Sequence, residues 1–496
     1  MLSDILLKTR PGRRSMGNFK VCDDRLGVKS MNPKIGEMGL TGVLLLFLFS
    51  CATTGRGVVA GKPLVAQYAL GVQRVLVLVV SFPGTPPQRS LAQIKVRALD
   101  RVADYYAKAS YGKVTIVGQV KGWYQLPRSL EDYKVSPYNI NVDPARVRKL
   151  VEDSFNAAEA EVNFGQYDHV IIVVGAETRP GSGYGMIAYC ANPGMLRAGL
   201  MRKGGARMEE IATRGGQRYE RGIVVVAENA LVGHIVHDLA HSMGGVVDGK
   251  RPIPDLYDTV LQGKVGPLTP ETFHKFAIFM GPWDVMSQHF VKGQQSMPGM
   301  SAFTRLRMGW IEERQLVEVL TGQSRAVTLA PLGSGRGTLV VKIPGSSGTY
   351  YLLENRQTLP SDPVLPAQGL LVLQVDESRQ DGDGIVRVEP ANPQVAEFGA
   401  ATYGLDPGQT PSLSLQRDVA VEVLWREGND LTLLITEKAR GPEIQAIAKK
   451  LREIEGRLSL STNGSGARAD LASAKELLLQ MKISEARAKL ENTRWP

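Results

Sequence analysis

The pattern of apolar residues changes twice along this chain of 496 residues, and each change limits what a segment can fold into. From about residue 72 to 311, strand and helix patterns alternate: RVLVLVVSF (74–82), HVIIVV (169–174) and GIVVVA (222–227) predict buried strands, while 91–110 and the stretch after Asp143-Pro144 predict helices. Between 312 and 440, at least six short strand patterns are separated by Gly, Pro and Asp turns. From 441 onward the helical pattern returns on both sides of STNGSGAR.

These patterns predict an α+β protein of several domains, as the length also requires. We expect a mixed domain over 72–311, an all-β sandwich over 312–440 and a helical hairpin over 441–496. Residues 52–71 begin with small residues and no periodicity, which predicts a tether. Residues 1–51 are expected to be an N-terminal extension and a signal peptide.

The formal charge of +10 raises the question of nucleic-acid binding. Residues 1–38 hold eight basic and four acidic residues, and the excess of +6 in the remainder is spread without a dense basic run. No nucleic-acid motif accompanies it, so we expect no nucleic-acid partner.

The uncharged stretch GLTGVLLLFLFSC (39–51) has the length of a signal-peptide core and is too short to span a bilayer. Its end resembles a bacterial lipobox, which implies cleavage before Cys51, lipidation of that thiol and an exported lipoprotein. An uncleaved hydrophobic anchor is the alternative. Met31 or Met38 could be the true start, and Ala52 after the cysteine favours the outer membrane or the cell surface over retention at the inner membrane.

Three cysteines leave no expected internal disulfide in the mature chain. Cys22 is lost with the leader and Cys51 is committed to lipid, so Cys190 alone remains.

The stretch HIVHDLAHSMGG (234–245) places two histidines four residues apart. With Asn229 as its cap, we expect a helix from about Ala230 to Met243, on which His237 and His241 project from one face and can bind one metal ion. The alternative is two structural histidines on a core helix, because HxxxH alone is weak evidence of a metal.

Three blocks follow this stretch: PIPDLYD (252–258), GPWDVMSQ (281–288) and MSAFTRLRMGWI (300–311). With them the chain resembles the secreted bacterial zinc metallopeptidases typified by immune inhibitor A, whose pattern runs HExxHxxGxPDLYD, GxWDxM and a helix ending in LGW. The resemblance extends to VADYYAKASYGKVTIVGQVKGWYQLP (102–127), YYLLENRQ (350–357) and LPAQGLLVLQVDES (365–378), and so covers about 72–440.

The resemblance implies a metzincin-like catalytic domain over 72–311 that binds Zn²⁺. His237 and His241 match its ligand histidines, and Met286 matches its methionine turn, although a buried methionine also has a simple packing explanation. The third ligand is expected three residues after the motif glycine, whereas Asp255 stands eleven residues after Gly244. We favour Asp255, because PDLYD is intact around it, and keep Asp248 as the alternative.

Asp238 stands where the family has the glutamate that acts as general base. Aspartate has the same chemistry with one methylene less, so its oxygens stand back by about an ångström, which can cost on the order of 10²-fold in rate.

Three further features are weaker candidates. His289 could donate to the developing oxyanion. His234 could support the ligands, but an ordinary helix histidine is the favoured interpretation. The run DGDG (381–384) could bind Ca²⁺, although a hairpin turn explains it better.

The sequence thus predicts an exported, lipid-anchored zinc metalloendopeptidase that hydrolyses protein or peptide substrates by metal-activated water. A catalytically impaired, peptidase-like surface lipoprotein that acts as a binding module is the alternative. The strand at 74 follows the tether closely and leaves no room for a large propeptide. This feature is compatible with both the peptidase and the binding module.

Overall fold

The computed structural model describes residues 64–133, 144–177, 188–191, 210–257, 279–288, 297–379, 381–459, 465–493 and 495. All of them belong to one compact unit, Lys62–Pro496. Cys51 and the predicted signal peptide lie outside the described residues. Within the described part of the chain, the helices do not combine the length and the hydropathy that crossing a membrane requires.

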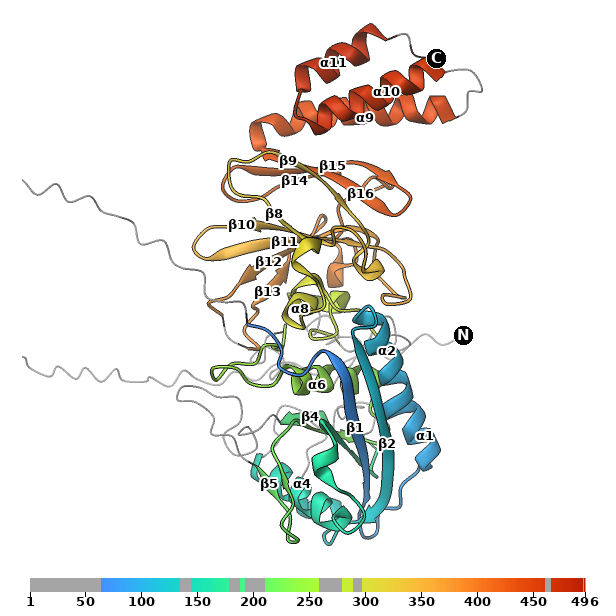
Figure 1. The fold of residues 1–496 in the computed structure, drawn as a ribbon, viewed down its shortest axis with the longest axis vertical. Helices are drawn as coiled ribbons and strands as arrows, with labels where there is room; N and C mark the ends of the chain where they lie inside the picture. Colours follow the sequence, from blue (N-terminus) through green and yellow to red (C-terminus); the bar gives the residue numbers. More distant parts are fainter. Residues whose placement is uncertain are drawn as a thin grey trace, which may run out of the picture. The chain divides into compact units, whose positions relative to one another are not determined.

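A mixed five-stranded sheet forms the base of the N-terminal half, with the strand order β2-β1-β3-β7-β4 (Figure 1). The strands are β1 (Gly71–Ser81), β2 (Val114–Gln125), β3 (His169–Val174), β7 (Ile223–Ala227) and β4 (Ala188–Ala191). The pairs β1–β2, β1–β3 and β3–β7 are parallel, and β4 runs antiparallel to β7 at the edge. The three buried strand patterns of the sequence therefore lie side by side at its centre.

Helices cover both faces of this sheet, as the continuous apolar run in β1 requires. On one face, side chains of β1 share a hydrophobic cluster with α1 (Leu91–Lys95), the π-helical turn Val96–Asp100, α2 (Arg101–Ala109) and α6 (Val232–Gly244). On the other face, the alternate side chains pack with α4 (Pro144–Ala158), beside α3 (Leu130–Tyr133). A small ribbon of β5 (Ile211–Ala212) and β6 (Arg218–Tyr219) also contributes to the second cluster.

Two sheets follow the short helix α8 (Ala302–Arg307). The first has the order β13-β12-β11-β10-β8 and contains β8 (Leu316–Glu318), β10 (Val340–Pro344), β11 (Thr349–Arg356), β12 (Gly369–Asp376) and β13 (Val386–Val388). The second has the order β14-β15-β16-β9 and contains β9 (Arg325–Leu329), β14 (Ser412–Ser414), β15 (Val419–Glu427) and β16 (Asp430–Glu437). Side chains of both sheets form one hydrophobic cluster.

The opposite face of the first sheet is not exposed. Alternate residues of β11 and β12, such as Leu352 and Leu373, belong to the same cluster as α6 and the buried Trp283. Because side chains on a strand alternate between faces, β11 and β12 pack against both the second sheet and the N-terminal half. The core around α6 is thus built from residues on both sides of position 312.

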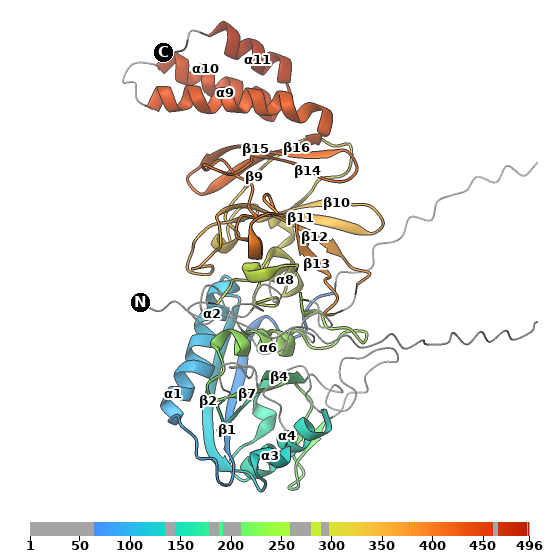
Figure 2. The ribbon, with the colours of Figure 1, turned by 180° about the vertical axis from the view of Figure 1, so that it is seen from behind.

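Three helices end the chain: α9 (Gly441–Ser459), α10 (Ser465–Leu479) and α11 (Ile483–Asn492) (Figure 2). Their apolar side chains pack with Leu424, Trp425 and Leu434 on the second sheet. The predicted hairpin is wrong in one respect, since the second helical stretch is divided. Met481 adopts a positive φ of 61° between α10 and α11, a conformation that a helix cannot contain.

Candidate metal centre

The helix α6 carries the HDxxH motif through the interior of the molecule. Every residue from Gly233 to Gly244 is buried, and the helix packs against β4 and β7. The hydroxyl of Tyr106, on α2, donates a hydrogen bond to the Val236 carbonyl at 2.7 Å. Such a helix holds its side chains in fixed directions, which a metal site requires.

The start of this helix differs from the prediction. Leu231 is its cap and Val232 its first residue, so Asn229 is not the cap. Asn229 instead lies in the turn after β7, where the backbone of Glu228 bonds back to the Val174 carbonyl. The chain therefore makes a turn directly after β7, and α6 begins only after this turn. The predicted end near Met243 is confirmed: the helix ends at Gly244, and its cap Gly245 has a φ of 68°.

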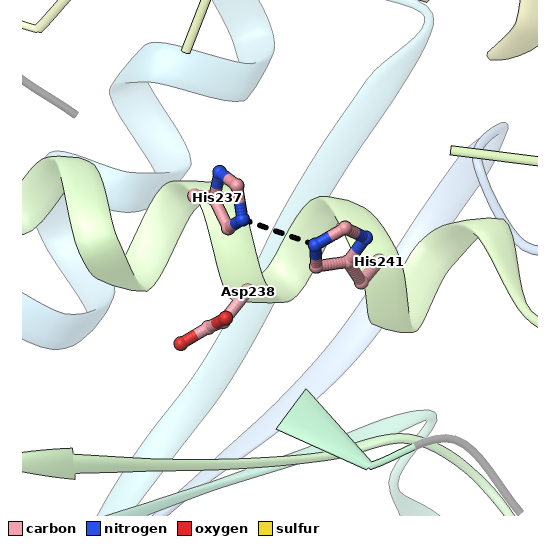
Figure 3. Close-up of side chains that lie close together, drawn as sticks. All are labelled: His237, Asp238 and His241. Atoms are coloured by element: carbon pink, nitrogen blue, oxygen red, sulfur yellow. Dashed lines mark hydrogen bonds between the residues drawn. The ribbon is translucent and has the colours of Figure 1, made fainter. Parts of the chain in front are cut away.

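Three donor atoms meet beside this helix. The Nε2 atoms of His237 and His241 are 3.0 Å apart, and each lies 3.0 Å from Oδ1 of Asp255. Figure 3 shows the two imidazoles facing one another from successive turns. The structure therefore brings together the two predicted histidines and the favoured third ligand.

The hydrogen bonds of the imidazoles fix which nitrogen carries the proton. Nδ1 of His237 lies 3.0 Å from the Val285 carbonyl, and Nδ1 of His241 lies 2.7 Å from the Ile253 carbonyl. A carbonyl only accepts, so both Nδ1 atoms donate, and in neutral rings both Nε2 atoms present lone pairs. Two lone pairs and a carboxylate oxygen that point at one another repel unless a cation lies between them.

The donor set fits zinc. Two imidazole nitrogens and one carboxylate oxygen are a known set for catalytic zinc, and bond lengths of about 2.0–2.2 Å with tetrahedral angles place ligand atoms about 3.3 Å apart. The observed 3.0 Å separations are close to this value. The carbonyls on both Nδ1 atoms are the partners that ligating histidines usually have.

The charges of the cluster centre on Asp255. Burial opposes the ionisation of its carboxyl, yet the two imidazoles hold the pKa of Asp255 well below the usual range. Without a metal ion, Nε2 of His237 must carry a proton to bond Asp255; burial opposes this charge, but the hydrogen bond and the charge of Asp255 outweigh burial and raise the pKa of His237. Burial and the nearby Arg251 lower the pKa of His241 to about 4. The anionic Asp255 therefore requires a positive partner, which is either a proton on His237 or a metal ion.

The side chain of Asp238, on the same helix, does not point to the place where the two Nε2 atoms and Asp255 meet. One ligand atom each of His237, Asp238 and His241 lies within 4.8 Å of the others, and Figure 3 shows the Asp238 carboxyl to the side of the two rings. Oδ1 of Asp255, by contrast, is 3.0 Å from both Nε2 atoms, so Asp255 stays the predicted third ligand. Burial raises the pKa of Asp238 to about 7, and among the described residues its buried Oδ2 has no hydrogen-bond partner. A carboxyl of this kind is suited to exchanging a proton near neutral pH.

The loop between Gly244 and Asp255 explains how the longer spacing is accommodated. It turns at Gly245, forms a small antiparallel bridge between Val247 and Lys250, and then returns to the helix. The turn requires glycine, because Gly245 has a φ of 68° and a ψ of −153°, a conformation that other residues rarely adopt. Asp248, the alternative ligand, is exposed at the tip of the bridge with a positive φ of 49°.

The GPWDVM block forms a tight turn beneath the histidines. Met286 is fully buried, and its carbonyl accepts a hydrogen bond from Leu256 N at 3.0 Å. Asp284 holds the turn together: Oδ1 accepts from Met286 N at 2.8 Å, and Oδ2 accepts from the backbone and the hydroxyl of Ser301 and from the hydroxyl of Thr304. The turn supplies the Val285 carbonyl to His237, and the role of Met286 in supporting the metal stays a prediction.

The remaining candidates lie elsewhere or cannot be placed. His234 is buried one turn before His237, and burial lowers its pKa to about 3. His289 lies outside the described residues, as does Cys190's side chain. In the DGDG run, Oδ1 of Asp381 accepts from the backbone N–H of Asp255 at 2.6 Å, so this carboxylate is engaged with the candidate centre. Calcium at this run stays a prediction.

Sequence reasoning missed two neighbours of the ligands. Tyr257 stacks on His237 at a centroid distance of 6.2 Å, and Asp381 contacts the backbone of Asp255. The position of Tyr257 inside PDLYD was an available signal. Asp381 had none, because 126 residues separate it from Asp255.

Beside the mixed sheet, a buried helix thus carries two histidines whose Nε2 atoms meet a carboxylate oxygen, an arrangement that could hold a metal ion. Residues 87–173 match the family model described as immune inhibitor A peptidase M6, catalytic domain, so this part of the chain is similar to that peptidase family and the predicted resemblance is confirmed. The match runs from the loop after β1 into β3 and ends before α6. A comparison with curated proteins found no match.

Proposed function

We propose that the chain is an exported, lipid-anchored zinc metalloendopeptidase. The observation that carries this proposal is the convergence of two Nε2 atoms and Oδ1 of Asp255 at 3.0 Å from one another, with both Nδ1 atoms bonded to carbonyls. The family match supports a peptidase, and the donor set supports zinc.

The chain's own residues have defined roles in this proposal. His237, His241 and Asp255 would hold the zinc ion, which when bound supplies a Lewis acid that activates water and polarises the scissile carbonyl. Asp238 takes a proton from the attacking water and delivers it to the leaving amine, a role that a carboxylate beside the first ligand histidine can fill. The methionine turn keeps His237 in the tautomer that binds metal.

The sheet edge beside α6 suggests how a peptide could be held. β4 pairs with β7 along one edge, ends the sheet among the described residues, and packs against α6. An extended peptide that adds to such an edge gains backbone hydrogen bonds along its length. We therefore propose a protein or peptide substrate in extended form.

The proposal for location rests on the sequence. The uncharged stretch that ends at Cys51 supports export and lipidation, and the residue after it favours the outer membrane or the cell surface. We also propose that 312–440 forms a β-sandwich, supported by the cluster shared by its two sheets.

A proteolysis assay tests the activity. The purified chain is incubated with zinc and a denatured-protein substrate, beside Asp238→Glu and His241→Ala. Turnover by the native chain that His241→Ala abolishes supports the enzyme.

The same assay can favour the alternative of a binding module, which the shorter carboxylate of Asp238 motivates. If the native chain has no turnover but Asp238→Glu does, the centre can still bind the metal and the substrate and lacks only a general base of the right length. No turnover by either the native chain or Asp238→Glu would refute the enzyme proposal for this substrate class.

A further inference from the structure

The turn between β12 and β13 holds the third candidate ligand from the far side. Oδ1 of Asp381 accepts the backbone N–H of Asp255 at 2.6 Å, and the N–H of Gly382 donates to the Asp255 carbonyl at 3.1 Å. Both backbone polar groups of Asp255 are therefore bound by two adjacent residues of one turn. A residue held at both groups has little freedom to rotate away from the two imidazoles.

Asp255 needs such support, because it belongs to neither a helix nor a strand. It follows a loop that is longer than the motif spacing, whereas His237 and His241 are fixed by a fully buried helix. A longer loop leaves its end more conformations, and the entropy of ordering them opposes metal binding. Contacts from another part of the chain can supply the order that the loop does not.

The turn and the strand β13 that follows it also contact a second segment, at Phe279. The N–H of Val388, on β13, donates to the Phe279 carbonyl at 2.7 Å, and the Arg387 guanidinium lies 4.3 Å from the Phe279 ring centroid. Gly384 has a φ of 68°, and a side chain there would come within 2.5 Å of the same ring. Phe279 stands just before the GPWDVM block. The turn thus spans the segment of the third ligand and the segment that supports His237.

Asp381 also lies beside a cation of the long loop. Its Oδ2 is 3.7 Å from Nη1 of Arg251, a buried residue of that loop. The guanidinium attracts this carboxylate, and so reduces but does not cancel its repulsion with Asp255. Asp381 therefore contacts the long loop at two places, Arg251 and Asp255.

We propose that Asp381 is a positioning residue for the proposed metal ligand Asp255, and that Asp381 and Gly382, which precede β13, are an integral part of the metal centre. This inference rests on the proposed zinc site. Asp381 acts through the backbone of Asp255 and does not itself contact the metal.

Zinc affinity of the full chain, measured by competition with a chelator, tests the proposal. Asp381→Ala removes the acceptor, so we expect the affinity to fall about 10- to 100-fold, as for other residues that orient ligands. Asp381→Asn keeps an acceptor at Oδ1 and is expected to bind zinc nearly as the wild type does. Asp383→Ala removes an exposed carboxyl from the same turn and serves as the matched control, with no expected change.

The absorption spectrum of bound Co²⁺ gives a readout that a loss of stability alone would not move. We expect an altered spectrum for Asp381→Ala and an unaltered one for Asp383→Ala, because only the first displaces a ligand. Should Asp381→Ala not fold, Asp381→Ser, whose shorter side chain withdraws the acceptor, replaces it with the same expectation.

Three results would overturn the inference. If Asp381→Ala or Asp381→Ser has the zinc affinity and the Co²⁺ spectrum of the wild type, Asp255 does not need the hydrogen bond to Asp381. An equal loss in Asp381→Asn would show that charge, and not hydrogen-bond acceptance, is required. A wild-type chain that binds no zinc would overturn the proposed function together with this inference, whereas the first two results leave the proposed function intact.

Discussion

The carbonyl oxygen of Val285 accepts a hydrogen bond from Nδ1 of His237 at 3.0 Å, and so the turn that contains Met286 decides which nitrogen of the first motif histidine faces the other two donors. In the same way, the Ile253 carbonyl accepts a hydrogen bond from Nδ1 of His241 and orients that ring. The candidate centre therefore depends on backbone groups of two loops as much as on the helix that carries the motif.

Metal content gives the first prediction. We expect the wild-type chain to bind one zinc ion and His237→Ala to lose most of it, because one of three donors is removed. His234→Ala is the matched control, since it removes the same ring one turn earlier on the same buried helix. Elemental analysis after dialysis measures both, and full zinc content in His237→Ala would disprove the assignment.

Asp238→Asn should separate metal binding from turnover. The amide keeps the volume of the side chain but cannot take a proton, so zinc content is expected to stay at the wild-type level while turnover falls by about 10²-fold or more. Parallel zinc and rate measurements check this. If zinc is lost together with turnover, Asp238 is a ligand and not the base.

His169 should make the fold sensitive to mild acid. Its ring is buried between the Ser242 hydroxyl at 2.7 Å and Oε1 of Gln73 at 3.0 Å, and burial lowers its pKa from 6.5 to about 4. Below pH 6.5 the unfolded chain takes up a proton that the folded chain refuses, so stability is present above that pH and is lost as the pH falls toward 4. The free energy of unfolding is expected to fall by about 3 kcal/mol over this range.

The variant His169→Gln lacks this titration. Its free energy of unfolding, measured in denaturant at several pH values, is expected to fall less steeply between neutral pH and pH 4 than that of the wild type. Parallel curves for the two proteins would show that His169 does not carry the effect.

Arg356 joins the first β-sheet to the methionine turn within the core. Its guanidinium lies 2.8 Å from Glu354 and 2.6 Å from Asp362, and Nη1 donates to the Trp283 carbonyl at 2.9 Å. Arg356→Met leaves two buried carboxylates without their cation, which is expected to cost about 3–5 kcal/mol of stability.

An exposed arginine provides the comparison. Arg336 pairs with Asp430 at 2.7 Å, but its side chain is 62% exposed, so Arg336→Met is expected to cost at most about 1 kcal/mol. Denaturant unfolding of both variants tests the difference. Similar losses would mean that the buried network does not contribute more than a surface pair.

Local patterns predicted the parts of the fold that local forces decide. The β-branched runs became β1, β3 and β7, and the four-residue spacing of His237 and His241 was enough to expect both rings on one side of a helix. The intact PDLYD block was likewise a sufficient reason to prefer Asp255 over Asp248. Each of these predictions needs only a few neighbouring residues.

Contacts between distant segments could not be predicted in this way. The start of α6 depends on the bond between Glu228 N and the Val174 carbonyl, which delays the helix past Asn229. The division of α10 from α11 depends on one backbone conformation at Met481. The contact of Asp381 with Asp255 joins positions 126 residues apart, and no spacing rule reaches that far.

The distance in sequence between α6 and the β12–β13 turn has a consequence for the order in which the protein is made. A polypeptide leaves the ribosome from its N-terminus, so Asp255 exists well before Asp381 and Gly382 can bind it. The strands β11 and β12, which share a hydrophobic cluster with α6, also follow the motif helix in the chain. A growing chain therefore carries all three candidate ligands before it has the residues that hold the last of them in place.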